Sequence, residues 1–319
     1  MSDTLLRRSE VAIPAELRPG QLLARNPQRL QRSAYPHFRS LPIRWSDVEN
    51  GIVSRVGMAQ FYEDTRTLVM REILGHENFG FDKWKGLLRA ITFEHLSPAR
   101  HDLPIEMAGA IGEVGRSSYA FALAAFQGER CISLCRAIGV TVDNEMHAAP
   151  TPPELRLLFL SHVWPHADAL PVGHGDADLP KQAYAYPFVE EYPTRFSDTD
   201  AIGHVNNVAV TRYHDNGLMA FQAALTGRVT VHGDAGYWHV ARHEISMLEE
   251  SFYPAPMRAC IGVMGEIGPT HFTLAQALFQ EGRCTGLAIV EISVLDASGK
   301  PRALSAALRD RLERNRLAG

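Results

Sequence analysis

The chain has 319 residues, of which 45% are hydrophobic and 21% are charged, and its formal net charge is 32 − 36 = −4. This composition is typical of a globular protein with a sizeable core, and the small negative charge does not favour a nucleic acid or an anionic membrane surface as a partner. No apolar run approaches the ~20 residues of a membrane span, and no apolar segment follows Arg7 and Arg8. The sequence therefore predicts neither a membrane span nor a secretory signal.

The cysteine and histidine patterns do not indicate a metal site. Four cysteines occur without the spacing of zinc ligands, namely Cys131, Cys135, Cys260 and Cys284. If Cys131 and Cys135 share a strand, they lie about 13 Å apart, which is too far for a disulfide. Three loosely spaced histidines also stand without cysteines, namely His162, His166 and His174. We therefore expect reduced thiols, no bound metal and a cytoplasmic location.

The chain contains an internal repeat. A shift of 151 residues superposes identical residues in this order: Arg44 on Arg195, Ser46 on Ser197, Asp47 on Asp198, Tyr62 on Tyr213 and Asp64 on Asp215. Further along the shift becomes 153, with these matches: Gly112-Glu113 on Gly265-Glu266, Gly115 on Gly268, Phe126-Gln127 on Phe279-Gln280, Arg130-Cys131 on Arg283-Cys284 and Asp143 on Asp296. Ordered matches at a nearly constant offset predict a duplicated domain of about 130 residues, whose two copies can pair their sheets as a dimer does.

Breaking residues and composition divide the chain into four predicted segments. Residues 1–36, rich in Arg and Pro, are expected to form an extended or weakly helical arm. The first domain covers 37–162 and the second covers 185–319. Between them, residues 163–184 are rich in Pro, Gly and Asp, which is typical of a linker.

Both repeats show the same order of predicted elements. In the first, a strand at 38–45 and a helix at 53–73 precede strands at 88–96, 105–114, 119–127 and 130–142, and Pro152-Pro153-Glu154 starts a short helix. In the second, a strand at 185–196 and a helix at 205–225 precede strands at 238–249, 257–267, 272–280 and 283–295, and Pro301 opens a last helix. One strand, one long helix and four strands per repeat is an α+β pattern.

Polar residues are concentrated where the strand of the second repeat meets its helix. Five of them fall within ten residues: Asp198, Asp200, His204, Asn206 and Asn207. Aspartate and histidine can move protons, and asparagine is also a favoured helix N-cap. A turn that leads into a helix presents free backbone N–H groups and the positive end of the helix dipole, which can bind a developing oxygen anion.

The run from Asp198 to Asn207, followed by Tyr213-His214-Asp215, resembles the Asp-x-Asp-x-x-Gly-His-Val-Asn-Asn pattern of the hotdog-fold thioesterases, especially the 4-hydroxybenzoyl-CoA thioesterase-like group. The stretches Gly265-Glu266-Ile267-Gly268 and Phe279-Gln280 also look like that family's hairpin strands. The resemblance covers nearly all of 185–319 and, more weakly, 37–160. It implies two tandem hotdog domains, each a long central helix wrapped by an antiparallel sheet, paired within the chain as a pseudo-dimer.

The resemblance also implies an activity. It implies hydrolysis of an acyl thioester of coenzyme A or acyl carrier protein, with the catalytic carboxylate at Asp200 and the acyl chain between the two repeats. It implies no metal and no redox cofactor. Whether Asp200 acts as nucleophile or general base, or only caps the turn, stays open, as does a homodimer of such chains.

The other candidate residues each have a structural alternative. His204 polarises the substrate carbonyl or orients Asp200, or else it bonds to backbone at the helix start. Asn206 and Asn207 contact substrate or cap the helix. Arg283 binds coenzyme A phosphates or lies solvated at a strand edge. Asp64 and Asp215 are expected to tie helix to strand.

The first repeat departs from the pattern. Its turn, Asp47-Val48-Glu49-Asn50-Gly51, keeps acidic residues, but the shift of 151 places Val53 on His204 and Arg55 on Asn206. Glu49 could serve a second active site, or it could be a solvated turn residue.

Two other functions remain open. A hotdog hydratase or dehydratase acts on the same thioesters, but its Asp-x-Asn-Pro-x-x-His-type turn is missing here. A non-catalytic acyl-binding or assembly protein is consistent with the departing first repeat and less so with the intact second motif. Release of a free thiol distinguishes a thioesterase from both of these alternatives.

Overall fold

The computed structural model describes residues 26–75, 85–167 and 178–318. The chain divides into two compact units. We call residues 26–167 the first unit and residues 178–318 the second unit. Most of the predicted arm (1–25) and much of the predicted linker (168–177) lie outside the described residues. The described end of the arm forms two short 3₁₀ helices, η4 (Pro27–Leu30) and η5 (Arg32–Ala34).

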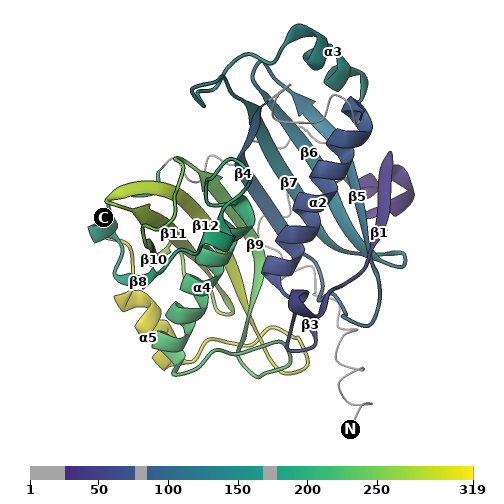
Figure 1. The fold of residues 1–319 in the computed structure, drawn as a ribbon. Coiled ribbons are helices and arrows are strands. Elements are labelled where there is room, and N and C mark those ends of the chain that lie inside the picture. The colour runs from purple at the N-terminus through teal and green to yellow at the C-terminus, as the bar shows by residue number, and fades with distance from the viewer. Residues whose placement is uncertain (1–25, 76–84, 168–177, 319) are drawn as a thin grey trace. The chain divides into compact units, whose positions relative to one another are not determined.

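The first unit is one long helix on a five-stranded antiparallel sheet (Figure 1). The helix is α2 (Arg55–Leu74). The strands pair in the order β1 (His37–Leu41), β5 (Ile105–Val114), β6 (Ser118–Gln127), β7 (Arg130–Thr141) and β4 (Gly86–His95). Two further strands of two residues, β2 (Val48–Glu49) and β3 (Ile52–Val53), form a small hairpin before α2, and α3 (Pro153–Ser161) follows the sheet.

The second unit repeats this arrangement. Its helix is α4 (Asn207–Thr226), and it is preceded by the 3₁₀ helix η8 (Phe196–Asp198). The strands pair antiparallel in the order β8 (Phe188–Tyr192), β10 (Met257–Met264), β11 (His271–Gln280), β12 (Arg283–Leu295) and β9 (Tyr237–Met247), and α5 (Ala306–Arg314) ends the unit. The expected α+β architecture, a long helix against an antiparallel sheet in each repeat, is confirmed.

The core of the second unit lies between α4 and its sheet. Residues spaced by three or four along α4 face inward, and they include Leu218, Phe221 and Leu225. Burying each such side chain contributes about 1.5–3 kcal/mol to the free energy of folding. Gly217 allows a close approach, because a Cβ atom there would lie 2.9 Å from the Cβ of Ala259 on β10.

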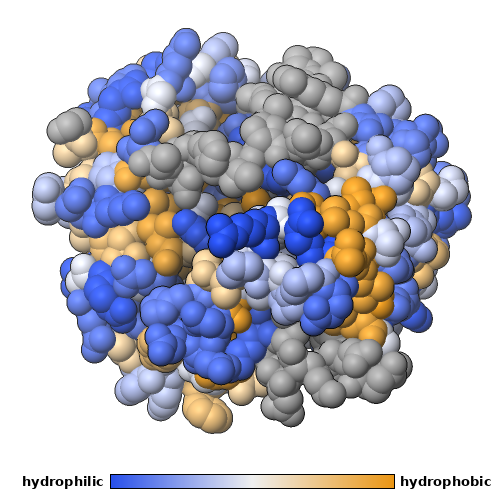
Figure 2. Space-filling view, turned by 90° about the horizontal axis from the view of Figure 1, so that it is seen from above, coloured by the Kyte–Doolittle hydropathy of each residue, from blue (hydrophilic) through white to orange (hydrophobic). Residues whose placement is uncertain are grey.

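The surface combines polar and apolar areas. On the face drawn in Figure 2, hydrophobic residues lie in separate patches between hydrophilic ones. The most exposed large side chains include Trp45 in the first unit and Phe196 in the second, 80% and 77% exposed. No helix among the described residues has the length and apolar character needed to cross a membrane.

Two predicted elements need correction. The strand predicted at 185–196 is limited to Phe188–Tyr192, because Pro193 follows it. The chain then enters a 3₁₀ turn, in which the Asp198 carboxylate accepts the backbone N–H of Arg195 at 2.9 Å. The last helix does not begin at Pro301, which forms a β-bridge with Leu295. It begins at Ala306, because the Ser305 hydroxyl caps it by accepting the Leu308 N–H at 3.2 Å.

The alignment of the two repeats also needs correction, because the true offset at the helices is 152. Ser54 and Asn206 are the N-cap residues of the two 20-residue helices. Their backbone N–H groups donate to the Asp47 and Asp198 carbonyls at 2.8 and 2.7 Å. Asn206 therefore corresponds to Ser54 and not to Arg55.

The same offset pairs His204 with Ile52 and not with Val53. Ile52 forms a β-bridge with Arg100, and His204 forms the matching bridge with Phe252. The cause is a turn that is one residue shorter in the first unit, where only Asn50 and Gly51 separate Glu49 from Ile52. Both turn residues have positive φ, 51° and 81°.

A helix shifted by one residue turns each side chain by about 100°. Asp64 and Asp215 are therefore not equivalent, although the sequence shift of 151 superposes them. Asp64 is exposed to solvent, whereas Asp215 is 6% exposed. The two aspartates therefore occupy different environments, and their predicted role in tying helix to strand stays a prediction.

Candidate active site

The turn between β8 and α4 holds the carboxylate of Asp200 by backbone contacts. Its Oδ1 accepts the N–H of Ile202 at 3.0 Å and that of His204 at 3.3 Å. The turn is closed by the Asp200 N–H, which donates to the His204 carbonyl at 2.9 Å, and by Gly203, whose φ of 87° favours glycine. Among the described residues, Oδ2 of Asp200 has no hydrogen-bond partner, so the half-buried carboxylate keeps one oxygen for chemistry.

The His204 side chain contacts an acidic residue from another loop. Its Nε2 is 3.4 Å from Oε1 of Glu250, and its side chain is 14% exposed. The ring of Phe252 meets the imidazole edge to face, with centroids 5.2 Å apart. Glu250 thus lies against the imidazole of His204, whose backbone N–H also holds the Asp200 carboxylate.

Glu250 is a candidate that the sequence did not single out. It directly follows Glu249, the last residue of the strand predicted at 238–249. No spacing rule connects it to the motif at 198–207. The β-bridge between His204 and Phe252 and the bond from the Val205 N–H to the Ser251 carbonyl, 2.8 Å long, bring its loop to the turn. An acid pair at a strand end was the only available signal.

The two asparagines differ in their surroundings. Asn206 caps α4, because its Oδ1 accepts the N–H of Val208 at 2.7 Å. Asn207 is the first residue of the helix, and its carbonyl accepts the Thr211 hydroxyl at 3.0 Å. The N-terminal turn of α4, with its N–H groups and positive dipole end, therefore directly follows the carboxylate turn.

Asp198 links the turn to helix α4 by hydrogen bonds. Its carboxylate is buried and accepts hydrogen bonds from Arg212 Nη1 at 2.9 Å and from the Tyr213 hydroxyl at 2.5 Å. Both donors are on the second turn of α4. Burial first, and then the bond to Asp198, raises the pKa of Tyr213, so its hydroxyl stays a donor.

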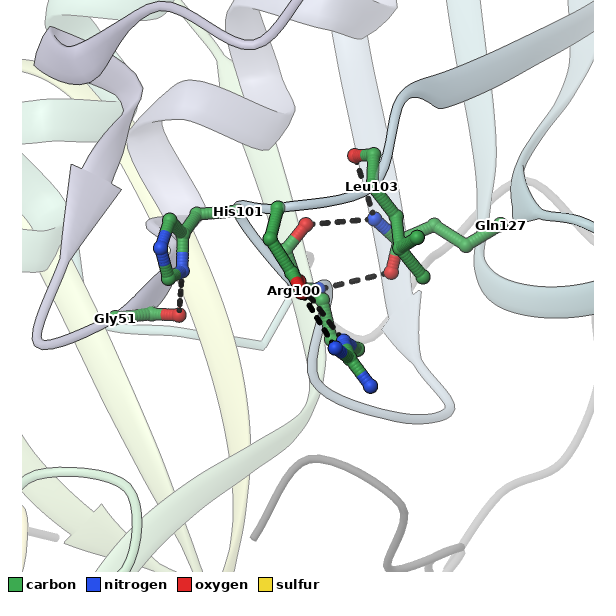
Figure 3. Close-up of polar contacts among 6 residues, drawn as sticks. Gly51, Arg100, His101, Leu103 and Gln127 are labelled. Atoms are coloured by element: carbon green, nitrogen blue, oxygen red, sulfur yellow. Dashed lines mark hydrogen bonds and ion pairs between the residues drawn. The ribbon is translucent and has the colours of Figure 1, made fainter. Parts of the chain in front are cut away.

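The corresponding turn of the first unit carries fewer reactive groups. Glu49 occupies the position of Asp200, but Ile52 replaces His204. At the offset of 152, Pro98 replaces Glu250. The nearby His101 contacts this turn, since its Nδ1 lies 2.7 Å from the Gly51 carbonyl oxygen (Figure 3).

A buried glutamine holds the loop next to this turn in each unit. In the first unit, Gln127 accepts the Arg100 N–H at 2.8 Å and donates to the carbonyls of Arg100 and Leu103 at 2.7 and 3.1 Å (Figure 3). In the second unit, Gln280 accepts the Phe252 N–H at 2.8 Å and donates to the carbonyls of Phe252 and Ala255 at 2.8 and 2.7 Å. The scaffold around the two turns is thus the same, although the reactive groups differ.

The remaining candidate, Arg283, lies at the protein surface. Arg283, at the start of β12, forms an exposed ion pair with Glu249 at 3.2 Å. Such a pair contributes only about 0–1 kcal/mol to stability, so the guanidinium remains available to a ligand. No group of three or more His, Cys, Asp and Glu side chains within the described ranges has the geometry of a metal site.

No protein-family model matches the sequence, and no curated protein matches it. Solved structures do match. A putative oleoyl thioesterase from Lactobacillus plantarum is 14% identical, with a TM-score of 0.63 over 82% of this chain and 96% of its own. The 12:0-ACP thioesterase from Umbellularia californica is 14% identical, with a TM-score of 0.64 over 81% of this chain and 97% of its own. An acyl-ACP thioesterase from Bacteroides thetaiotaomicron is 13% identical, with a TM-score of 0.61 over 81% and 97%.

These similarities extend over most of both units. At this level of identity they concern the fold, which is the tandem double hotdog that the resemblance implied.

Proposed function

We propose that this chain is a thioester hydrolase that cleaves an acyl thioester of coenzyme A or acyl carrier protein into a free acid and a thiol. One observation carries the proposal. The carboxylate of Asp200 is held by the backbone N–H groups of Ile202 and His204, keeps one oxygen unbonded among the described residues, and lies in the turn that leads into α4. The names of the similar structures, which describe oleoyl, 12:0-ACP and acyl-ACP thioesterases, support the substrate class.

Asp200 supplies the reacting carboxylate. As a general base it takes a proton from water, whose oxygen attacks the thioester carbon. As a nucleophile it attacks that carbon itself, and water then hydrolyses the resulting anhydride. Either route forms a tetrahedral oxyanion, which then breaks the C–S bond. The sulfur leaves as a thiolate and takes up a proton to become the free thiol.

The neighbouring groups stabilise charge along this route. The N–H groups and dipole of the first turn of α4 are suited to bind the oxyanion, because they directly follow the carboxylate turn. His204 is suited to polarise the carbonyl or to protonate the leaving thiolate, and Glu250 orients its imidazole. Asn206 acts in this scheme as a helix cap, Asn207 as a substrate contact, and Arg283 as a contact for coenzyme A phosphates.

A panel of acyl-CoA and acyl-carrier-protein thioesters tests the reaction class. We expect release of a free thiol that reacts with a chromogenic disulfide, together with the free acid. A hydratase instead changes the acyl group without releasing thiol, and a binding protein releases nothing. Either of these outcomes contradicts the proposal.

A further inference from the structure

We propose that Gln280 is a positioning residue that fixes the loop at 250–255, and through it His204, for the thioester hydrolysis proposed above. Its amide joins three backbone groups of the loop at once. Oε1 accepts the Phe252 N–H at 2.8 Å, and Nε2 donates to the Phe252 and Ala255 carbonyls at 2.8 and 2.7 Å. Gln280 is 1% exposed, so these bonds are shielded from water.

The fixed loop makes the contacts that define the position of His204. The Ser251 carbonyl accepts the Val205 N–H at 2.8 Å, and Phe252 pairs with His204 in a β-bridge. Oε1 of Glu250 lies 3.4 Å from the imidazole Nε2. Three consecutive loop residues thus contact the turn, and Gln280 binds the backbone of the last of them.

The position of Gln280 is itself well determined. It is the last residue of β11, which pairs with β10 on one side and β12 on the other. The next residues, Glu281 and Gly282, form a tight turn with φ of 52° and 81°. A side chain at the end of a central strand is a rigid support for a loop that has no regular structure of its own.

The first unit offers a natural control. Gln127 makes the same three kinds of bond to the loop at 100–103, but the adjacent turn has Ile52 in place of His204. Removing either glutamine amide therefore costs the same type and number of hydrogen bonds. Only the removal at Gln280 disturbs the imidazole.

The test compares Gln280→Leu with Gln127→Leu in the full-length chain. We expect both variants to lose thermal stability to a similar extent. Only Gln280→Leu is expected to lower kcat, by at least tenfold relative to Gln127→Leu, while KM for the acyl thioester changes less than threefold. A purely structural role would instead give equal effects of the two variants, and that result would overturn the proposal.

Two further measurements keep the test decisive. If Gln280→Leu does not fold, Gln280→Asn replaces it, because asparagine retains the amide but is one methylene too short to reach the loop. Gln127→Asn is then the control, and we expect the same difference in kcat between the two variants. Hydrogen exchange of the Val205 amide serves as a readout that does not need activity. Faster exchange in the Gln280 variant, but not in the Gln127 variant, is expected even if wild-type protein hydrolyses no thioester, and unchanged exchange refutes the positioning role.

Discussion

Glu250 and His204 meet although they are 250 − 204 = 46 positions apart in the chain. Nε2 of His204 and Oε1 of Glu250 are 3.4 Å apart. A carboxylate at this distance can orient an imidazole. At the scale of single residues, the site therefore depends on a contact that only the folded chain creates.

The Glu250–His204 contact leads to a prediction about rate. Glu250→Gln keeps the shape of the side chain but removes its charge. We expect kcat/KM to fall at least ~10-fold, because the loss of the orienting charge removes part of the ~100- to 10,000-fold that a positioned proton-transfer group contributes. Steady-state kinetics measure the effect, and Glu249→Gln, one residue earlier and paired with Arg283 at the surface, is the control. Equal kinetics for the two variants would show that Glu250 has no role.

His214 gives a prediction about pH. It is buried, and burial lowers its pKa from 6.5 to about 3. Below pH 6.5 the imidazole is protonated in the unfolded chain, but in the folded chain it stays neutral down to about pH 3. The free energy of unfolding therefore decreases as the pH falls from 6.5 to about 3. At pH 5 the effect is about 2 kcal/mol.

Replacing His214 should remove this dependence. We expect His214→Phe to lose less stability than wild type between pH 7 and pH 5, as measured by chemical denaturation. His243 on β9, whose ring centroid lies 6.0 Å from that of His214, remains in both proteins. Identical losses in the two proteins would show that His214 does not stay neutral in the folded state.

At the scale of elements, both helices begin with a side-chain cap, but the caps differ in what surrounds them. Ser54 accepts the Gly57 N–H at 3.0 Å, and Asn206 accepts the Val208 N–H at 2.7 Å. The serine cap stands beside a turn that lacks the histidine, whereas the asparagine cap stands beside the proposed site. Stability and activity can therefore be separated by mutation.

Removal of each cap should cost the same stability. We expect Asn206→Ala and Ser54→Ala each to lower the free energy of unfolding by about 1 kcal/mol, because one helix N–H loses its acceptor. Asn206→Ser, which still caps, should restore both the stability and kcat/KM. A loss of kcat/KM in Asn206→Ser at full stability would show that the asparagine amide contacts substrate.

The elements themselves were largely predictable, and the register between the repeats was not. Helical spacing of apolar residues gave 205–225 where α4 covers Asn207–Thr226, and hairpin glycines gave the strand limits to within a few residues. The offset of 151 failed because a turn that is one residue shorter in the first unit shifts the register of the helix, while Tyr62 and Asp64 match identical residues at 151 by coincidence. The contact of Glu250 with His204 was not predictable either, since it depends on a loop held by Gln280.

At the scale of the whole molecule, duplication has kept the scaffold and changed the chemistry. Each unit has a buried aspartate in the turn, a capped helix and a glutamine that holds a loop. The first unit keeps Glu49 but carries Ile52 and Pro98 where the second has His204 and Glu250. Ile52 cannot transfer a proton as His204 can, so we expect one active site per chain.

One site per chain can be tested at Glu49. We expect Glu49→Gln to leave kcat/KM within twofold of wild type, and titration of active sites in a single turnover to give one per chain. A tenfold loss, or two sites per chain, would show that the first unit is catalytic too.

The most direct test of the central claim is thiol release by Asp200→Asn, measured on the best acyl thioester at a folded fraction matched to wild type by circular dichroism. The asparagine retains an oxygen for the N–H groups of Ile202 and His204, so the turn should persist. We expect kcat to fall at least ~100-fold, because the reacting carboxylate is gone. An unchanged kcat in the folded variant would contradict the assignment of the active site to this turn.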